Sequence, residues 1–134
     1  MTNSIPEIED ADCIFVIGSN TTEAHPLIAH RIFKALDKGA KLIVVDPRKT
    51  QLAELSHIHA RLNFGTDVAF LNGLMYEILE NKWHNEPFIA ERTEDFEPFK
   101  AAVQNYSPAK ASAICGIPSD VIHEIAALYA TSKT

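Results

Sequence analysis

The chain has 134 residues, of which 46% are hydrophobic and 22% charged, the length and composition of one soluble globular domain. Its formal net charge of −6, without any basic stripe, excludes the usual class of nucleic-acid-binding proteins. The apolar runs are too short to cross a bilayer and no signal peptide pattern is present, so a cytoplasmic segment without membrane contact is expected; an export signal of a longer protein would precede it.

The first half of the chain alternates runs typical of strands with a run of helical spacing. After an acidic lead-in segment (residues 1–12), Cys13 to Ile17 is a continuous apolar run typical of a strand buried on both faces. A loop follows, and Pro26 then suits the first position of a helix that Gly39 ends. Lys41 to Val45 is a second buried strand. This order predicts a βαβ unit, and therefore a parallel sheet with a right-handed crossover.

Further elements are predicted toward the C-terminus. A short helix over Lys49 to Leu55 and a third strand near Ile58 to Leu62 are expected. Thr66 or Asp67 then caps a helix with a wide apolar face suited to packing on the sheet, made of Val68, Leu71, Leu74, Met75, Ile78 and Leu79. After Asn81 we expect three more helices, over Glu86 to Glu91, Phe96 to Val103 and Ser119 to Thr131, with Ser119 as the N-cap of the last.

These elements predict an α/β fold, with a three-layer Rossmann-like parallel sheet flanked by helices and a helical C-terminal part. The expected organisation is a single dinucleotide-binding-like domain over residues 1–134. Its βαβ-type core covers residues 13–80, and residues 81–134 are mainly helical. Because a separate domain of about fifty residues would be marginally stable, the helical part is expected to cover one edge of the sheet.

Ligands of doubly wound sheets bind outside the carboxyl ends of the strands, and three loops of this chain follow such ends. They span Gly18 to His25, Asp46 to Thr50 and Asn63 to Asp67. Gly18 permits close approach of a ligand to the backbone, but the turn lacks the full G-x-G-x-x-G pattern of a nicotinamide site. The three loops predict a nucleotide site in which local donors, rather than the net charge, hold any phosphate.

The second loop carries the side chains with the clearest ligand chemistry. Asp46 closes a strand at a position where a carboxylate commonly binds ribose hydroxyls or a base edge, and Arg48 offers a planar fork for a phosphate or a carbonyl-bearing base. A plainer interpretation stands beside this one, because Asp-Pro after a strand is also a routine turn and Arg48 can be simply solvated. His25, next to the first loop, is open to the same choice between a ligand contact and packing of the turn.

No catalytic or metal-binding residue is predicted. Cys13 and Cys115 form no Cys-x-x-Cys pair and are expected to be structural, with Cys115 in a turn-like stretch. His57 and His59 lie two residues apart on a predicted strand, but no carboxylate or cysteine nearby completes a metal site. The other histidines, His30, His84 and His123, are expected on the surface or along helices, and no Gly-x-Ser-x-Gly nucleophile pattern is present.

Several stretches of the chain together resemble one family. Val16 to Pro26 resembles the glycine-x-asparagine, acidic, histidine-proline loop of the molybdopterin oxidoreductases, with most similarity to the catalytic (alpha) subunit of molybdenum or tungsten formate dehydrogenases. Gly39 to Arg48 resembles the second strand of that family with its Asp-Pro-Arg end, and Gly65 to Leu74 resembles its Gly-Thr-Asp helix start. Later stretches follow in family order: Phe88 to Glu94, Tyr106 to Pro108 and Gly116 to Pro118.

The resemblance implies a cofactor, molybdopterin guanine dinucleotide, two of which hold molybdenum or tungsten in these enzymes. It implies that this chain belongs to the domain that binds one of the two. The first loop would lie along the dinucleotide, Asp46 and Arg48 would meet its guanosine end, and Gly65 with Asp67 would close the site. The cofactor-binding residues implied in this way are Gly18, Ser19, Asn20, Glu23, Asp46, Pro47, Arg48, Gly65 and Asp67.

Complete enzymes of the family also carry an iron–sulfur cysteine cluster and a cysteine or selenocysteine on the metal, which this sequence lacks. The chain is therefore interpreted as an excised internal domain that is not catalytic alone. Its parent would oxidise formate to CO2 and pass electrons to an iron–sulfur centre, and its partners would be the remaining domains of that subunit and electron-transfer subunits. Two alternatives stay open: the same domain of a nitrate or polysulfide-type reductase, and a stand-alone nucleotide-binding or interaction module.

Overall fold

Three short parallel strands, β1 (Cys13–Ile17), β2 (Lys41–Val45) and β3 (Ile58–Ala60), form a sheet in the order β1-β2-β3. The computed structural model describes residues 4–133, which divide into two compact units. The first unit holds the sheet and runs to Arg61, with residues 132–133 added, and the second unit covers Leu62–Thr131. The expected α/β fold with a parallel sheet is confirmed.

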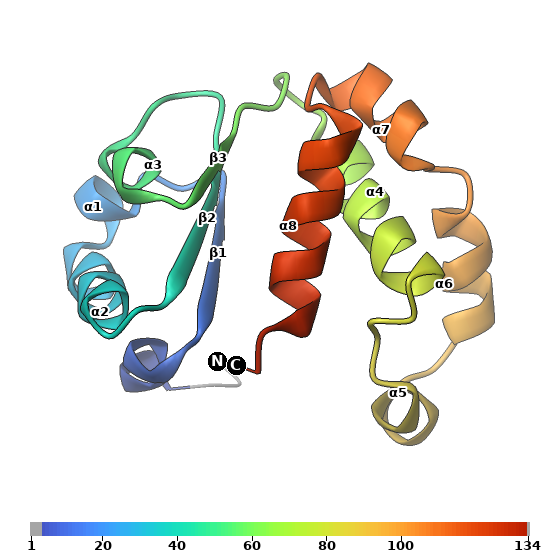
Figure 1. Ribbon diagram of the computed structural model, residues 1–134, viewed down its shortest axis with the longest axis horizontal. Coiled ribbons are helices and arrows are strands. Elements are labelled where there is room, and N and C mark those ends of the chain that lie inside the picture. Colours follow the sequence, from blue (N-terminus) through green and yellow to red (C-terminus); the bar gives the residue numbers. More distant parts are fainter. Residues whose placement is uncertain (1–3, 134) are drawn as a thin grey trace. The chain divides into compact units, whose positions relative to one another are not determined.

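The first unit interleaves helices with these strands, as the sequence predicts. Its helices are the 3-10 helix η1 (Ile5–Asp10), α1 (Thr21–Ala24), α2 (Pro26–Asp37) and α3 (Gln51–Leu55). Figure 1 shows α1, α2 and α3 on the same side of the three strands. The prediction of loop structure through Thr22 was wrong, because α1 begins at Thr21, and β3 ends at Ala60, two residues before the expected Leu62.

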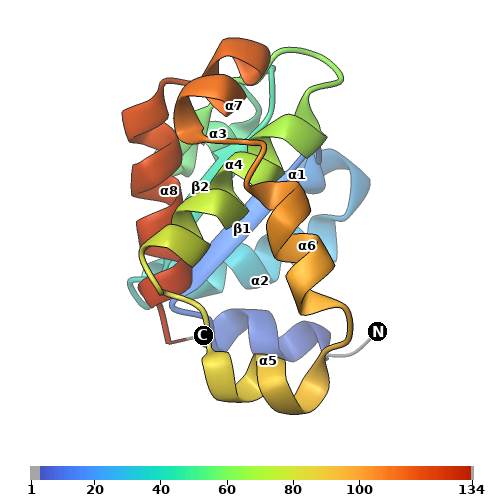
Figure 2. The ribbon, with the colours of Figure 1, turned by 90° about the vertical axis from the view of Figure 1, so that its right-hand side faces the viewer.

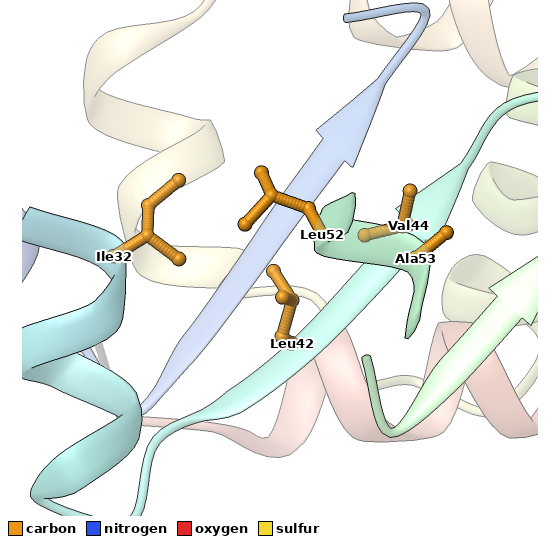
Figure 3. Packing of buried hydrophobic residues seen from close by; sticks show 5 residues of the cluster. All are labelled: Ile32, Leu42, Val44, Leu52 and Ala53. Carbon is orange, nitrogen blue, oxygen red and sulfur yellow. The ribbon is translucent and has the colours of Figure 1, made fainter. Parts of the chain in front are cut away.

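The core of this unit lies between one face of the sheet and the helices α2 and α3. Alternate residues of β2 point to that face and meet side chains of both helices in a cluster made of Ile32, Leu42, Val44, Leu52 and Ala53 (Figure 3). All residues of β2 after Lys41 are buried, but every residue of β1 is only half-buried. The expectation that β1 is buried on both faces was therefore wrong, because β1 is an edge strand of this sheet and β2 is the central one.

Helix α2 ends where the sequence predicts, and the geometry gives the reason. Gly39 has a φ of +98°, which side chains rarely adopt. The N–H of Ala40 donates to the carbonyl of Ala35 at 3.0 Å and that of Gly39 to Leu36 at 2.9 Å, which satisfies carbonyls left free by the last turn. The chain then enters β2 directly.

Charged side chains fasten η1 to α2. The carboxylate of Glu9 accepts hydrogen bonds from Arg31 and, at 3.2 Å, from Lys34, while Lys38 pairs with Asp10 at 2.9 Å. The hydrogen bond from Arg31, with the Lys34 ammonium, holds the pKa of Glu9 below its ordinary value. The Glu9 side chain is 18% exposed, so this pairing is better protected than a fully solvated one.

The second unit is helical. It contains α4 (Asp67–Glu80), α5 (Glu86–Arg92), α6 (Phe96–Val103), α7 (Pro108–Cys115) and α8 (Ser119–Thr131). Helix α7 was not predicted, and Cys115, expected in a turn, is its last residue and fully buried. Ser119 is the first residue of α8 rather than its N-cap.

Helix α4 packs mainly against other helices of this unit, α7, α8 and α6 (Figure 2). Its buried residues are Ala69, Phe70, Gly73 and Leu74, whereas Val68 is 68% exposed and Leu71 is half-buried. The predicted apolar face of α4 was thus only partly right, because Leu74 is buried as expected but Val68 is not. Small residues allow the close contact: a β-carbon added at Gly73 would lie 2.6 Å from Cβ of Ala111 in α7.

Among residues 4–133, no single helix is long and apolar enough to cross a membrane. Helices α7 and α8 pass the same test of length and composition only when taken together, and they are bent by 111° at the break between them. Five of their apolar residues are buried: Ala111, Cys115, Ile122, Ile125 and Ala126.

Candidate functional site

The strand register brings the ends of all three strands into one row. Ile17 of β1 pairs with Val45 of β2, and Val45 pairs with Ala60 of β3. The next residues, Gly18, Asp46 and Arg61, therefore leave the sheet side by side, with neighbouring strands about 4.8 Å apart. The first two of the predicted loops lie together at this carboxyl edge of the sheet.

The first loop starts with a backbone conformation that favours glycine. Gly18 has a φ of +60°, its N–H donates to the Val45 carbonyl at 3.0 Å, and a β-carbon added there would meet nothing within 4 Å. The hydroxyls of Ser19 and Thr21 bond at 2.9 Å, and the Asn20 side-chain oxygen accepts a hydrogen bond from the Thr22 hydroxyl at 3.2 Å. The loop is ordered by its own polar side chains and leaves open space beside Gly18.

The end of this loop, from Glu23 to His25, is exposed. The Asn20 carbonyl accepts the N–H groups of Glu23 and Ala24 at 3.1 and 3.0 Å, which starts α1. Glu23, a predicted site residue, is exposed in that helix. His25 is exposed as well, and its carbonyl accepts the N–H groups of Ile28 and Ala29, so its backbone initiates α2. The His25 side chain makes no cap hydrogen bond, so the choice between a ligand contact and packing of the turn stays open for it.

Asp46 is buried although it stands at the start of a loop. It is 2% exposed, and its Oδ1 accepts hydrogen bonds from the backbone N–H of Arg48 at 2.8 Å and from Arg48 Nε at 3.3 Å. The carboxylate therefore closes its own turn, the plainer interpretation that the sequence left open. Arg48 projects outward, its side chain 64% exposed, and keeps further N–H donors available.

Two residues of β3 and its end secure the same turn, and neither was a predicted site residue. His59 Nε2 lies 3.0 Å from the Asp46 carbonyl oxygen, and Arg61 Nε donates to the Pro47 carbonyl at 3.0 Å. Both contacts cross from β3 to the turn after β2, thirteen and fourteen residues away in sequence. Local sequence patterns do not predict contacts between residues this far apart in the chain.

The third loop lies in the second unit. Gly65 is exposed with a φ of +75°, and a β-carbon added to it would meet nothing within 4 Å. The Thr66 hydroxyl donates to the Asn63 carbonyl at 2.7 Å, and the Thr66 carbonyl accepts the N–H of Phe70 at 3.0 Å. Of the two expected caps, Thr66 takes the N-cap position, without a side-chain cap bond, and Asp67 is exposed in the first turn of α4.

No cluster of three or more His, Cys, Asp or Glu residues suited to a metal ion occurs within residues 4–133. His57 Nδ1 accepts the backbone N–H of Leu42 at 3.1 Å, and this contact is at the opposite end of β3 from the Asp46 turn. Burial raises the pKa of the Cys13 thiol above its ordinary value, and a hydrogen bond with Ser132 opposes part of that shift. The Cys13 thiol is therefore protonated at neutral pH, which disfavours a nucleophilic or ligand role.

A separate open cavity of about 420 Å³ lies in the second unit, lined by α5, α6 and the residues before α5. His84 contributes to it and is only 15% exposed, so the prediction of a surface position for this residue was wrong. Its Nδ1 is buried without a hydrogen-bond partner among the described residues, and its ring lies 6.1 Å from that of Phe96. None of the predicted site residues lines this cavity.

Comparison with known proteins assigns these loops to a family. The model of the molybdopterin oxidoreductases matches residues 1–126. The F420-dependent formate dehydrogenase subunit alpha of Methanocaldococcus jannaschii is 48% identical over 99% of this chain, and the periplasmic nitrate reductase of Desulfovibrio desulfuricans is 36% identical over 94% of it. The chain spans about a fifth of the length of these relatives, 20% and 18% respectively.

A solved structure agrees with the sequence comparison. Acetylene hydratase from Pelobacter acetylenicus superimposes on 96% of this chain with a TM-score of 0.87 and 28% sequence identity, and the match covers 19% of that protein. The family match thus covers the three parallel strands, the loops after them and most of the helical unit. On this evidence the chain belongs to the molybdopterin oxidoreductase family.

Proposed function

We propose that this chain binds the nucleotide end of a molybdopterin guanine dinucleotide within the alpha subunit of a formate dehydrogenase. The observation that carries this proposal is the Asp46–Arg48 turn at the carboxyl edge of a parallel sheet. Three hydrogen bonds hold the turn, and it presents the Arg48 guanidinium outward. Ligands of open parallel sheets bind at this edge. The loop at Gly18 stands beside the turn, with open space where a side chain would be.

The residues present fit the nucleotide part of such a cofactor. Arg48 is exposed and its guanidinium provides planar hydrogen-bond donors for phosphate or base oxygens. Ser19, Asn20 and Glu23 add polar groups on the neighbouring loop. The bound group would supply the metal and its redox chemistry, whereas residues of this chain would orient the nucleotide.

The formate assignment is supported by the degree of similarity to relatives. The formate dehydrogenase subunit of M. jannaschii shares 48% of residues with this chain, against 36% for the nitrate reductase of D. desulfuricans. A nitrate reductase is the second candidate, because that relative also matches most of the chain, 94% of it. In either case the longer protein would work with its remaining domains and with electron-transfer partners.

A nuclear magnetic resonance titration of the 134-residue chain with GDP tests the binding role, with ADP as the control nucleotide. We expect amide shifts to concentrate at Gly18 to Asn20 and at Asp46 to Arg48, with a smaller response to ADP. Shifts confined to the cavity near His84, or an equal response to both nucleotides, would contradict the proposed role.

The reaction is tested on the longer protein that carries this chain, isolated with its cofactor. Formate-dependent reduction of a viologen dye, without nitrate-dependent dye oxidation, is the expected result. The reverse pattern would support the nitrate reductase candidate and overturn the formate assignment.

A further inference from the structure

We infer that Arg61, which directly follows β3, is a phosphate-binding residue of this nucleotide site and acts together with Arg48. The inference rests on the proposed function and adds to it a residue and the ligand group that it contacts. Its basis is the position of Arg61 in the row formed by the strand ends, its bond to the Asp46–Arg48 turn, and its uncompensated charge.

The position of Arg61 is set by backbone pairing. Ala60, the last residue of β3, pairs with Val45, and the N–H of Asp46 donates to the Ala60 carbonyl at 3.2 Å. Arg61 therefore leaves the sheet next to Asp46, on the side away from Gly18. Its Nε donates to the Pro47 carbonyl at 3.0 Å, which holds the guanidinium over the turn.

The two arginines differ in how their charges are balanced. Arg48 has a carboxylate partner, because its Nε lies 3.3 Å from Asp46 Oδ1. Arg61 donates to a neutral carbonyl, and no ion pair joins it to a carboxylate among residues 4–133. Arg61 is also exposed, so its terminal N–H groups are open to a ligand.

An uncompensated guanidinium favours an anion over a neutral base edge, and phosphate oxygens match its planar donors. In a chain of net charge −6, a nucleotide phosphate gains little from long-range attraction. A fixed local cation at the edge of the sheet supplies the attraction for a phosphate that the overall charge does not. The geometry points to Arg61 as that cation.

The test measures the affinity of the 134-residue chain for GDP and for guanosine by calorimetry at one ionic strength. Arg61→Ala should weaken GDP binding by about tenfold or more, as expected for loss of a charge-assisted hydrogen bond, and leave guanosine binding within about twofold. Arg61→Lys, which keeps the charge, should recover part of the loss. The matched control is Lys41→Ala, which removes an equally exposed positive charge at the opposite end of β2 and should change neither affinity.

Three results would overturn the inference while leaving the proposed function intact. One is GDP binding that Arg61→Ala leaves unchanged. Another is an equal loss of GDP and guanosine, which would mean that Arg61 only holds the Pro47 carbonyl. A third is wild-type affinity that does not differ between GDP and guanosine. If the wild-type chain binds neither molecule, the proposed function itself fails.

Discussion

The contact between α4 and α7 gives a prediction whose size follows from one distance. A β-carbon at position 73 would lie 2.6 Å from Cβ of Ala111, whereas carbon atoms in contact prefer about 3.5–4.0 Å. Neither atom can move by changing a rotamer, because both β-carbons are fixed by helical backbone. The substitution Gly73→Ala therefore forces the two helices apart by about 1 Å.

The expected cost combines two opposing contributions. Overpacking of a well-packed core costs about 1–3 kcal/mol, and the rigidity of both partners favours the upper end of that range. Alanine is favoured over glycine in a helix by about 1 kcal/mol. Gly73→Ala should thus lower the free energy of unfolding by about 2 kcal/mol, although the same change at an exposed helical position would raise it.

The assay is urea denaturation followed by circular dichroism, applied as a double-mutant cycle. Ala111→Gly removes the opposing β-carbon, so the double variant Gly73→Ala with Ala111→Gly should recover most of the steric cost. Ala113→Gly, at an exposed position of the same helix α7, is the matched control and should be additive with Gly73→Ala. Stabilisation by Gly73→Ala alone, or additivity in the Ala111 cycle, would refute the reasoning.

Three further predictions concern burial and charge. Asp46→Ala should destabilise the first unit by about 1–3 kcal/mol, because it leaves the Arg48 N–H without its buried acceptor. Asp46→Asn should retain most of that stability. Equal denaturation midpoints for both variants would contradict this prediction. Leu74→Ala should lower the free energy of unfolding by about 2–5 kcal/mol and Val68→Ala by less than about 0.5 kcal/mol, since these side chains are 6% and 68% exposed. Similar losses of stability for both variants in thermal melts would count against the α4 packing. The lowered pKa of Glu9 means that its ion pairs stabilise the fold above the ordinary value of 4.5 and lose that contribution as the pH falls through the lowered value. The stability difference between wild type and Glu9→Gln should accordingly shrink between pH 5 and pH 2, and a pH-independent difference would exclude the effect.

Much of the fold could be predicted from local pattern. Continuous apolar runs located β1 and β2, and Pro26 and Gly39 located the ends of α2, because these signals act within a few residues. Helix α7 was missed because Ala-Lys-Ala-Ser-Ala has little apolar periodicity, although Gly116, with a φ of +78°, is the stop signal that marks its end. The face of α4 was predicted only in part because its buried residues include Ala69 and Gly73, and hydrophobic patterns give small residues little weight.

The candidate site was less accessible from sequence for a related reason. The three loops follow from strand ends, and those positions can be read directly. The buried Asp46 accepts a hydrogen bond from the Arg48 N–H. The Asp-Pro-Arg pattern allows this bond both in a ligand site and in a routine turn, so the pattern alone does not predict the burial. Arg61 gains its role from a contact with Pro47, and that contact exists only after β2 and β3 have paired.

The common row of Ile17, Val45 and Ala60 has a consequence for engineering this chain. The length of each strand sets the position, along the strand direction, at which its loop begins. A one-residue deletion within β2 would therefore shift its turn by about 3.3 Å and reverse the face of every side chain beyond it. Substitutions within a loop leave the start position of the loop and the orientation of the strand side chains unchanged. Loops from other members of the family should therefore be exchangeable as whole cassettes, provided that the five-residue lengths of β1 and β2 are preserved.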